Sequence, residues 1–195
     1  MNSSSEGIRR RRLRVASQAL AGLVLAIGCL VLIGWALNIH PLKSPIPNMV
    51  SMKANAAIGF ILVGLGLLLP SIGRSPSWNR AAQLFASITF LIGLVTIVEY
   101  ILGINLFIDQ LFFRDTDVVG TSVPGRMGPN TAIGFLLMGL ALLLLLLPLQ
   151  HGPSAAQLLA AITGLIALAA ILGYAFGAED LYGFGRYTQM ALHTA

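Results

Sequence analysis

The sequence reads MKANAAIGFILVGLGLLLP at residues 52–70 and, with few changes, MGPNTAIGFLLMGLALLLL at residues 127–145. When the two segments are aligned without a gap, 12 of their 19 positions are identical. Each copy opens with a methionine, has an asparagine three residues later, and continues into an apolar run. A third copy of the opening, MALHTA, occupies residues 190–195. The repeat predicts similar structural units, each with an apolar helix that begins near this opening.

The composition is that of a membrane protein. Hydrophobic residues make up 56% of the chain and charged residues 10%, whereas soluble domains carry about 25% charged residues. The formal charge is +5, but five of the twelve basic residues lie together at positions 9–14. A nucleic-acid-binding protein would instead spread its basic residues over a folded face among stacking aromatic rings. We therefore expect an integral membrane protein without a nucleic-acid partner.

Five apolar runs are long enough to cross a hydrocarbon core of about 30 Å at about 1.5 Å per helical residue. The predicted spans are about 15–37, 53–69, 81–104, 130–147 and 155–177. The first run exceeds the core of a cleavable signal peptide, which is about 7–15 residues long, so we expect it to remain as a helix. The fold class is all-α, with a basic N-terminal tail (1–14), a five-helix membrane domain (15–177) and a C-terminal tail (178–195).

The distribution of basic residues in the loops predicts the orientation. The N-terminal cluster, Arg74 and Arg80 give one side of the membrane seven basic residues. The other side has five, namely Lys43, Lys53, Arg114, Arg126 and Arg186. We therefore expect the N-terminus in the cytoplasm. Five spans then place the C-terminus outside, so loops 38–52 and 105–129 lie on the outer face.

The helix that precedes each copy of the opening also ends in a similar way. Trp35, Tyr100 and Tyr174 occupy equivalent positions near these ends. Each unit is thus predicted to be one helix going out, an outer loop, and one helix coming back, which gives two and a half helical hairpins. Because aromatic side chains are enriched at membrane–water interfaces, we expect these three to anchor the helix ends there.

Glu99 is the one acidic residue inside a predicted span. A carboxylate in a membrane helix usually has a partner or a ligand. One interpretation is a functional role. The other interpretation is a carboxylate at the membrane interface, which is either hydrated or paired with Arg126 or Lys53.

Asn55 and Asn130 are equivalent in the repeat, and His193 stands at the same place in the third copy. An asparagine just before an apolar helical run is typical of an N-cap. Alternatively, the two asparagines and Glu99 converge in a polar pocket at the outer leaflet. Such a pocket would suit a quinone, a lipid headgroup or a small signal molecule.

Small residues recur at helical spacing in the second, fourth and fifth spans, and such faces let membrane helices approach closely. The candidate packing residues are Gly59, Gly64, Gly134, Gly139, Ala169, Gly173 and Gly177. They suit contacts within the bundle or with another subunit. For the fifth span we expect an external partner, because no apolar run follows the third opening.

Nothing in the sequence indicates an enzyme. We find no nucleophile–base constellation, glycine-rich phosphate loop or metal-ligand spacing, so we expect no catalytic residues and no metal. His40, His151 and His193 lie outside the middle of every span, which argues against haem held by two axial histidines. No cofactor is certain, and contact with lipid, quinone or pigment stays open. A transporter would need charged or broken helices at mid-membrane.

The repeats resemble the N-terminal multi-helix membrane sensor region of bacterial sensor histidine kinases and diguanylate cyclases. There, Met-x-Pro-Asn-Thr-Ala-x-x-Phe-Leu-Leu phrases begin alternate helices, and a soluble signalling module follows the last one. The likeness is carried by residues 52–69, 108–112, 127–144 and 187–195. It implies the bacterial inner membrane, a periplasmic C-terminal segment and, in the complete family pattern, a sixth helix leading to an effector domain.

This sequence has neither that sixth helix nor an effector domain. We expect a non-enzymatic accessory subunit of a larger bacterial membrane complex, photosynthetic or respiratory. It would pack through its small-residue faces and dock through outer segments 107–113 and 181–187. Its partners would be other membrane subunits and lipids. The alternative is a signal-sensing membrane module, or a fragment, of a sensor histidine kinase or diguanylate cyclase.

Overall fold

The computed structural model describes residues 3–195 except 48, 74, 118, 184 and 186. Arg74 and Arg186, which entered the prediction of orientation, lie outside the described residues, as does the side chain of Arg10. The described chain forms five long helices: α1 (Ser3–Ala36), α3 (Ala54–Ile72), α4 (Pro76–Leu102), α5 (Pro129–Leu146) and α6 (Gly152–Phe176). All five are long and apolar enough to cross a membrane. The chain is thus an all-α, multi-pass membrane protein, as the sequence predicts.

Three short helices lie between or after the long ones: α2 (His40–Lys43), η1 (Glu179–Leu181) and η2 (Leu192–Thr194). The sequence did not indicate α2, because prolines surround it. Its Pro41 stands in the first turn, where the missing N–H removes no helical hydrogen bond.

Several helix boundaries differ from the predicted spans. The arginine-rich segment extends α1 as a helix, whereas we expected a tail before residue 15. Pro70 lies inside α3 rather than ending it, and α3 closes two residues later, so few backbone bonds are affected. α4 begins at Pro76, five residues earlier than predicted, because Ser75 caps it by accepting a hydrogen bond from Ser77 N.

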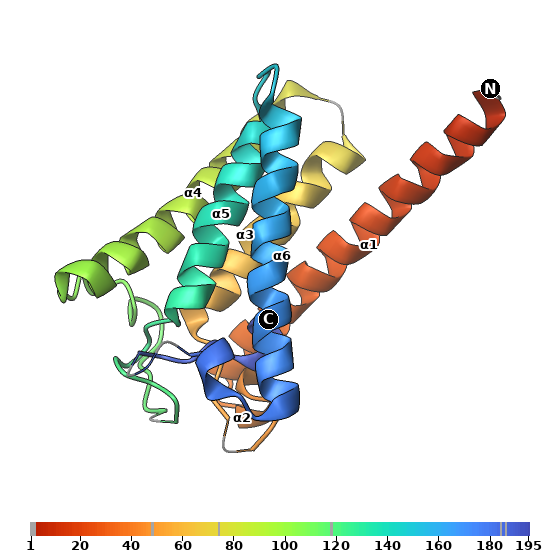
Figure 1. Ribbon diagram of the computed structural model, residues 1–195. Helices are drawn as coiled ribbons and strands as arrows, with labels where there is room; N and C mark the ends of the chain where they lie inside the picture. The colour runs from red at the N-terminus through yellow and green to blue at the C-terminus, as the bar shows by residue number, and fades with distance from the viewer. Residues whose placement is uncertain (1–2, 48, 74, 118, 184, 186) are drawn as a thin grey trace.

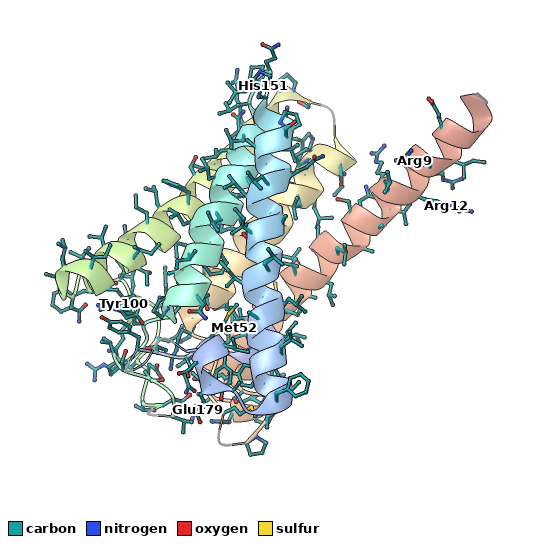
Figure 2. All side chains as sticks on the ribbon, viewed as in Figure 1. Arg9, Arg12, Met52, Tyr100, His151 and Glu179 are labelled. Carbon is teal, nitrogen blue, oxygen red and sulfur yellow. The ribbon has the colours of Figure 1, made fainter. Side chains whose placement is uncertain are left out.

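The long helices form a sequential bundle in which α1 packs on α3, α3 on α4, α4 on α5, and α5 on α6 (Figure 1). α1 and α6 share no extensive contact, and the first turns of α1 extend beyond its contact with α3, where Arg14 and Gln18 donate to Ser71. Residues 37–53, 103–128 and 177–195 gather at one end, which we name the loop end. Figure 2 shows Met52, Tyr100 and Glu179 at this end and Arg9 and Arg12 at the far end of α1.

Backbone contacts at glycine hold α1 against α3. A methyl group added at Gly28 would lie 2.7 Å from Ala57 O, and one added at Gly64 would lie 3.0 Å from Ala21 O. Such distances leave no room for a side chain between the helices. The α1–α3 hairpin therefore depends on glycine at both positions.

The same pair of contacts recurs between α4 and α5. A methyl group at Gly93 would lie 2.6 Å from Ala132 O, and one at Gly139 would lie 2.9 Å from Ala86 O. Gly28 and Gly93 each stand seven residues before the aromatic residue of their repeat. The two hairpins thus pack in the same register.

Two other predicted packing glycines also make close contacts. A Cβ atom at Gly59 would lie 2.5 Å from the Phe135 ring, and one at Gly173 would lie 2.8 Å from Leu181 Cβ. Gly59 thus lets α5 approach α3, and Gly173 lets the segment after α6 fold back on it.

The remaining three small residues lie elsewhere. The nearest atom to a Cβ at Gly134 is Thr163 Cγ2, at 3.8 Å. Gly177 has a φ of 68° and ends α6 in the left-handed conformation that glycine adopts readily. Ala169 is half-buried.

Candidate functional site

An aromatic side chain holds the opening of each repeat in place. In all three units the ring at the end of the outgoing helix donates a hydrogen bond to the backbone carbonyl of the opening methionine. The distances are 2.9 Å from Trp35 Nε1 to Met52 O, 2.8 Å from Tyr100 Oη to Met127 O, and 2.6 Å from Tyr174 Oη to Met190 O. The three residues predicted as interface anchors therefore make equivalent intramolecular hydrogen bonds.

The helices that follow the openings begin in a common register. α3 begins at Ala54, α5 at Pro129 and η2 at Leu192, in each case two residues after the opening methionine. Together with its tyrosine hydrogen bond, this places the third opening like the other two, at the start of a helical turn.

The prediction that Asn55 and Asn130 are N-caps is wrong. The N-cap residues are Lys53 and Gly128, and neither caps its helix through a side-chain hydrogen bond. Both asparagines are second residues of their helices, because the backbone becomes helical one residue before them. At Pro129 the fixed φ of proline favours this earlier start.

The two asparagines also face different surroundings. Asn55 Nδ2 donates to Asp109 Oδ1 at 3.4 Å, while Asn55 Oδ1 accepts from Ala56 N at 2.8 Å. Asn130 Oδ1 is buried and has no hydrogen-bond partner among the described residues. The predicted polar pocket of Asn55, Asn130 and Glu99 is therefore present only in part. Asn55 contacts Asp109 on the same side as Glu99, whereas Asn130 lies beside a separate apolar cavity.

Glu99 belongs to a buried ion network at the loop end. Its side chain is 0% exposed, and Arg126 Nη2 lies 3.3 Å from Glu99 Oε1. The same oxygen accepts from Leu106 N at 2.7 Å, and Arg126 Nε lies 2.8 Å from Asp109 Oδ2. The predicted pairing of Glu99 with Arg126 is confirmed, and one guanidinium is shared by two carboxylates.

The shared guanidinium affects the protonation of Asp109. Burial raises the pKa of Asp109 to about 6, although the hydrogen bond from Arg126 opposes this rise. The negative charge of Glu99 contributes further to the higher pKa. The carboxyl of Asp109 therefore changes its charge close to neutral pH.

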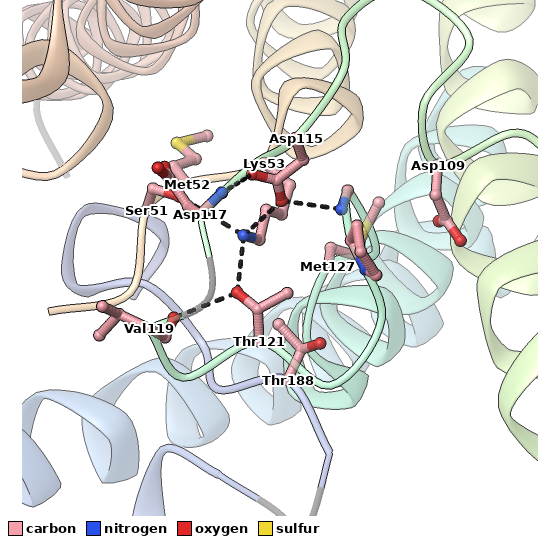
Figure 3. Close-up of polar contacts among 12 residues, drawn as sticks. Ser51, Met52, Lys53, Asp109, Asp115, Asp117, Val119, Thr121, Met127 and Thr188 are labelled. Atoms are coloured by element: carbon pink, nitrogen blue, oxygen red, sulfur yellow. Dashed lines mark hydrogen bonds and ion pairs between the residues drawn. The ribbon is translucent and has the colours of Figure 1, made fainter.

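A second buried ion pair ties the first loop to the second (Figure 3). Lys53 Nζ lies 2.7 Å from Asp115 Oδ2 and donates to Thr121 Oγ1 at 2.8 Å. Gly125 N also donates to Asp115 Oδ2, at 2.7 Å. We use the name polar layer for Lys53, Glu99, Asp109, Asp115 and Arg126 together.

The C-terminal segment packs against the 103–128 loop. Gln189 N donates to Gly120 O at 2.8 Å, and Ser122 N donates to Thr188 Oγ1 at 3.1 Å. The 103–128 loop is therefore joined by polar contacts both to Lys53 and to the C-terminal segment. Sequence reasoning missed Asp109 and Asp115, since three acids in one 105–129 loop offered no basis for choosing between them.

An apolar groove lies on the other side of the bundle, where α1 and α6 diverge. Its cavity has a volume of about 150 Å³ and is lined by residues that include Val24, Phe60, Asn130, Gly134, Ala167 and Thr194. These come from α1, α3, α5, α6 and η2. α6 is also the least covered helix, with 11% of its spanning residues buried against 28–39% in the others.

The groove has the same small-residue register as the two complete hairpins. Ala167 stands seven residues before Tyr174, as Gly28 and Gly93 stand before their aromatic residues, and it lines the cavity. Ala160 occupies the place equivalent to Ala21 and Ala86 and is exposed. α6 thus presents small residues where α1 and α4 receive their return helices.

No group of three or more histidine, cysteine, aspartate or glutamate side chains in the described part of the chain is placed to hold a metal ion. Burial lowers the pKa of His193 to about 4, and neither ring nitrogen has a hydrogen-bond partner among the described residues.

Comparison of the chain with family models, curated proteins and solved structures finds no match.

Replacing Tyr100 or Tyr174 by phenylalanine is expected to destabilise the protein by about 1 kcal/mol each, since the methionine carbonyl loses its donor. Tyr182→Phe is the matched control, because Tyr182 is buried and stacked on Tyr174 at 4.0 Å. No hydrogen bond of its hydroxyl is found among the described residues. Unfolding of the purified protein by denaturing detergent measures the three losses, and equal losses would contradict a specific role for the repeated bond.

Proposed function

We propose that this chain is a non-enzymatic membrane module that works by accepting one further transmembrane helix in the groove between α1 and α6. The main support is the third opening. Its tyrosine hydrogen bond and helical start match those of α3 and α5, and it stands beside a groove with the matching small residues. A helix in this groove would cover α6 as α3 and α5 cover α1 and α4.

The first setting for such a module is an accessory subunit of a larger complex in the bacterial inner membrane, with the N-terminus in the cytoplasm. The accepted helix then belongs to a neighbouring subunit. This setting would account for the low coverage of α6, because the helix of the neighbouring subunit would pack on its small residues. Outer segment 107–113 adds a docking surface, since Phe107, Leu111 and Phe112 are 65–78% exposed.

The second setting is a signal-sensing membrane module, as in the sensor family that the repeats resemble. The polar layer favours this setting. Its ion pairs connect the 103–128 loop to Lys53, next to the start of α3, and to Glu99 near the end of α4. A change at the loop end would therefore alter contacts of membrane helices, and the accepted helix would carry that change across the membrane.

A photo-crosslinking amino acid at Ala167 tests both settings. We expect a protein adduct from this groove position and only lipid adducts from Leu168, which is 50% exposed on the same helix. An adduct with a separate subunit favours the accessory setting. A crosslink to a later part of the same polypeptide favours the sensing module. Lipid adducts alone at Ala167 would contradict the proposal.

Filling the groove supplies the control for that experiment. Gly134→Leu adds a side chain towards the cavity, with Thr163 Cγ2 as the nearest neighbour, and is expected to reduce the Ala167 adduct about tenfold, since overpacking an interface costs about 1–3 kcal/mol. Leu165→Trp adds apolar volume to the same helix at a position that is 65% exposed and, being two residues before Ala167, lies on the opposite side of α6, so it should leave the adduct unchanged.

A further inference from the structure

A second cavity opens at the loop end, beside the polar layer and away from the groove. Its volume is about 250 Å³. It is lined by Glu99, Tyr100, Ser122, Val123, Arg126 and Tyr187, together with Gly103. This volume is below the range of about 300–1,000 Å³ typical of pockets for drug-sized ligands, so it suits a small chemical group.

One wall of this cavity has an unused hydrogen-bond acceptor. Glu99 Oε1 interacts with Leu106 N and Arg126, but Glu99 Oε2 has no partner among the described residues. The Glu99 side chain is 0% exposed. An unsatisfied buried carboxylate oxygen is costly. Either a proton on the neighbouring Asp109 carboxyl, whose interaction with Glu99 contributes to the raised pKa of Asp109, or a donor group of a ligand would satisfy it.

The local balance of charge favours a positively charged donor. Glu99 and Asp109 share one guanidinium, that of Arg126, so this cluster has one more acidic group than basic groups. The nearby ammonium of Lys53 is already bound to Asp115 at 2.7 Å. A ligand cation would therefore meet an acceptor and an excess of acidic groups at the same place.

Two tyrosine rings line this cavity, and a second cavity lies next to the same rings. The rings of Tyr100 and Tyr187 meet in an edge arrangement with centroids 5.0 Å apart, and the Arg126 guanidinium already lies over the Tyr100 ring, 5.3 Å from its centroid. This aromatic wall therefore already holds one cation, as aromatic rings do. The same two rings line an adjacent cavity of about 470 Å³, whose other residues are Ile97, Ile101, Pro129 and Ile133. A polar compartment thus adjoins an apolar one that runs along α4 and α5.

We propose that the cavity beside Glu99 binds a primary ammonium group, with one N–H donating to Glu99 Oε2, next to the edge-to-face pair of Tyr100 and Tyr187. The ammonium group belongs either to a small soluble amine or to the headgroup of an amine-bearing lipid. In the second case the adjacent apolar cavity receives part of the lipid chain. This site does not depend on a helix in the groove.

Thermal unfolding of the full chain in nanodiscs tests the site. The nanodiscs contain only phosphatidylcholine and phosphatidylglycerol, which have no primary amine. Ethanolamine at about one hundred times its Kd is expected to raise the Tm by about 5 °C or more. Phosphatidylethanolamine built into the disc is the second probe. Stabilisation by ethanolamine identifies a soluble amine, and stabilisation by the lipid alone identifies a headgroup.

Three variants make the result specific. Glu99→Gln keeps the shape but removes the charge, and should weaken binding by about tenfold or more. Val123→Trp fills the cavity without altering the ion pairs, which keeps the test valid where Glu99→Gln unfolds. Glu179→Gln removes an exposed acid at the same end and should leave the Tm shift unchanged.

Three results would overturn the assignment. The first is no Tm shift with either probe. The second is a full shift in a folded Glu99→Gln or Val123→Trp variant. The third is an equal shift with choline, which has no N–H to donate to Glu99 Oε2.

Discussion

Replacement of Arg126 by methionine is expected to lower the free energy of unfolding by about 3–5 kcal/mol, because it leaves Glu99 and Asp109 buried without a counter-charge. The Arg126 side chain is 5% exposed and bonds to both carboxylates and to Ile104 O at 3.0 Å. Methionine retains the packing volume and removes all of these bonds. Unfolding in denaturing detergent, with tryptophan fluorescence as the signal, measures the loss.

Arg114→Met is the matched control, since Arg114 is an exposed arginine in the same loop. Its effect should stay within about 0.5 kcal/mol, as for most surface substitutions. Adding Glu99→Gln and Asp109→Asn to the Arg126→Met variant should recover part of the lost stability, because no uncompensated charge then remains. A small loss in Arg126→Met, close to that of Arg114→Met, would show that the ion network contributes little.

Replacement of Gly93 by leucine is expected to cost about 3 kcal/mol or more and to separate α4 from α5. An added Cβ would lie 2.5 Å from Leu136 N and 2.6 Å from Ala132 O. These are backbone atoms of a helix, so they cannot move aside as a flexible side chain would. The stability of the folded protein in mild detergent, followed by heating and size-exclusion chromatography, measures the effect.

Gly164→Leu controls for the added apolar volume. Nothing lies within 4 Å of a Cβ built at Gly164, so this variant should unfold within about 0.5 kcal/mol of the parent protein. Gly28→Leu should resemble Gly93→Leu, because its added Cβ would lie 2.7 Å from Ala57 O. Equal behaviour of the Gly93 and Gly164 variants would contradict the close approach of the two helices.

The membrane helices were predictable because length and hydropathy are sufficient to identify them. All five spans are present, and their errors lie at the ends, where local capping decides the outcome. Ser75, Pro76 and Pro70 show why: a cap and a first-turn proline started α4 early, while a proline near the end of α3 was tolerated. Hydropathy does not contain this information.

The polar layer was predictable only in part. Glu99 was conspicuous as an acid inside a span, and the basic residues on its side of the membrane limited its partners to a few. The Lys53–Asp115 pair joins residues 62 positions apart, and only the folded 103–128 loop brings them together. The hydrogen bonds from aromatic side chains to Met52, Met127 and Met190 occur at equivalent positions of the repeat. They could not be predicted, because their acceptors are backbone carbonyls, which every residue has.

The groove could not be located from the sequence, because its position depends on which helices are neighbours. That α1 and α6 share no extensive contact is a property of the arrangement in space. α6 is the least covered of the long helices, and an external partner for it stays a prediction. The place of Ala167 in the groove became visible only through its match to Gly28 and Gly93.

The fastening of α1 has a mechanical consequence. Its loop end is held by the Trp35 hydrogen bond and by Lys43, whose ammonium lies 4.5 Å from the Trp35 ring centroid. Further along, Gln18 Nε2 donates to Ser71 Oγ at 3.1 Å and Arg14 donates to Ser71 O, so α1 is also tied to the end of α3. Arg9 stands five residues, or about 7.5 Å, before Arg14, so the arginine cluster follows any movement of the end of α3.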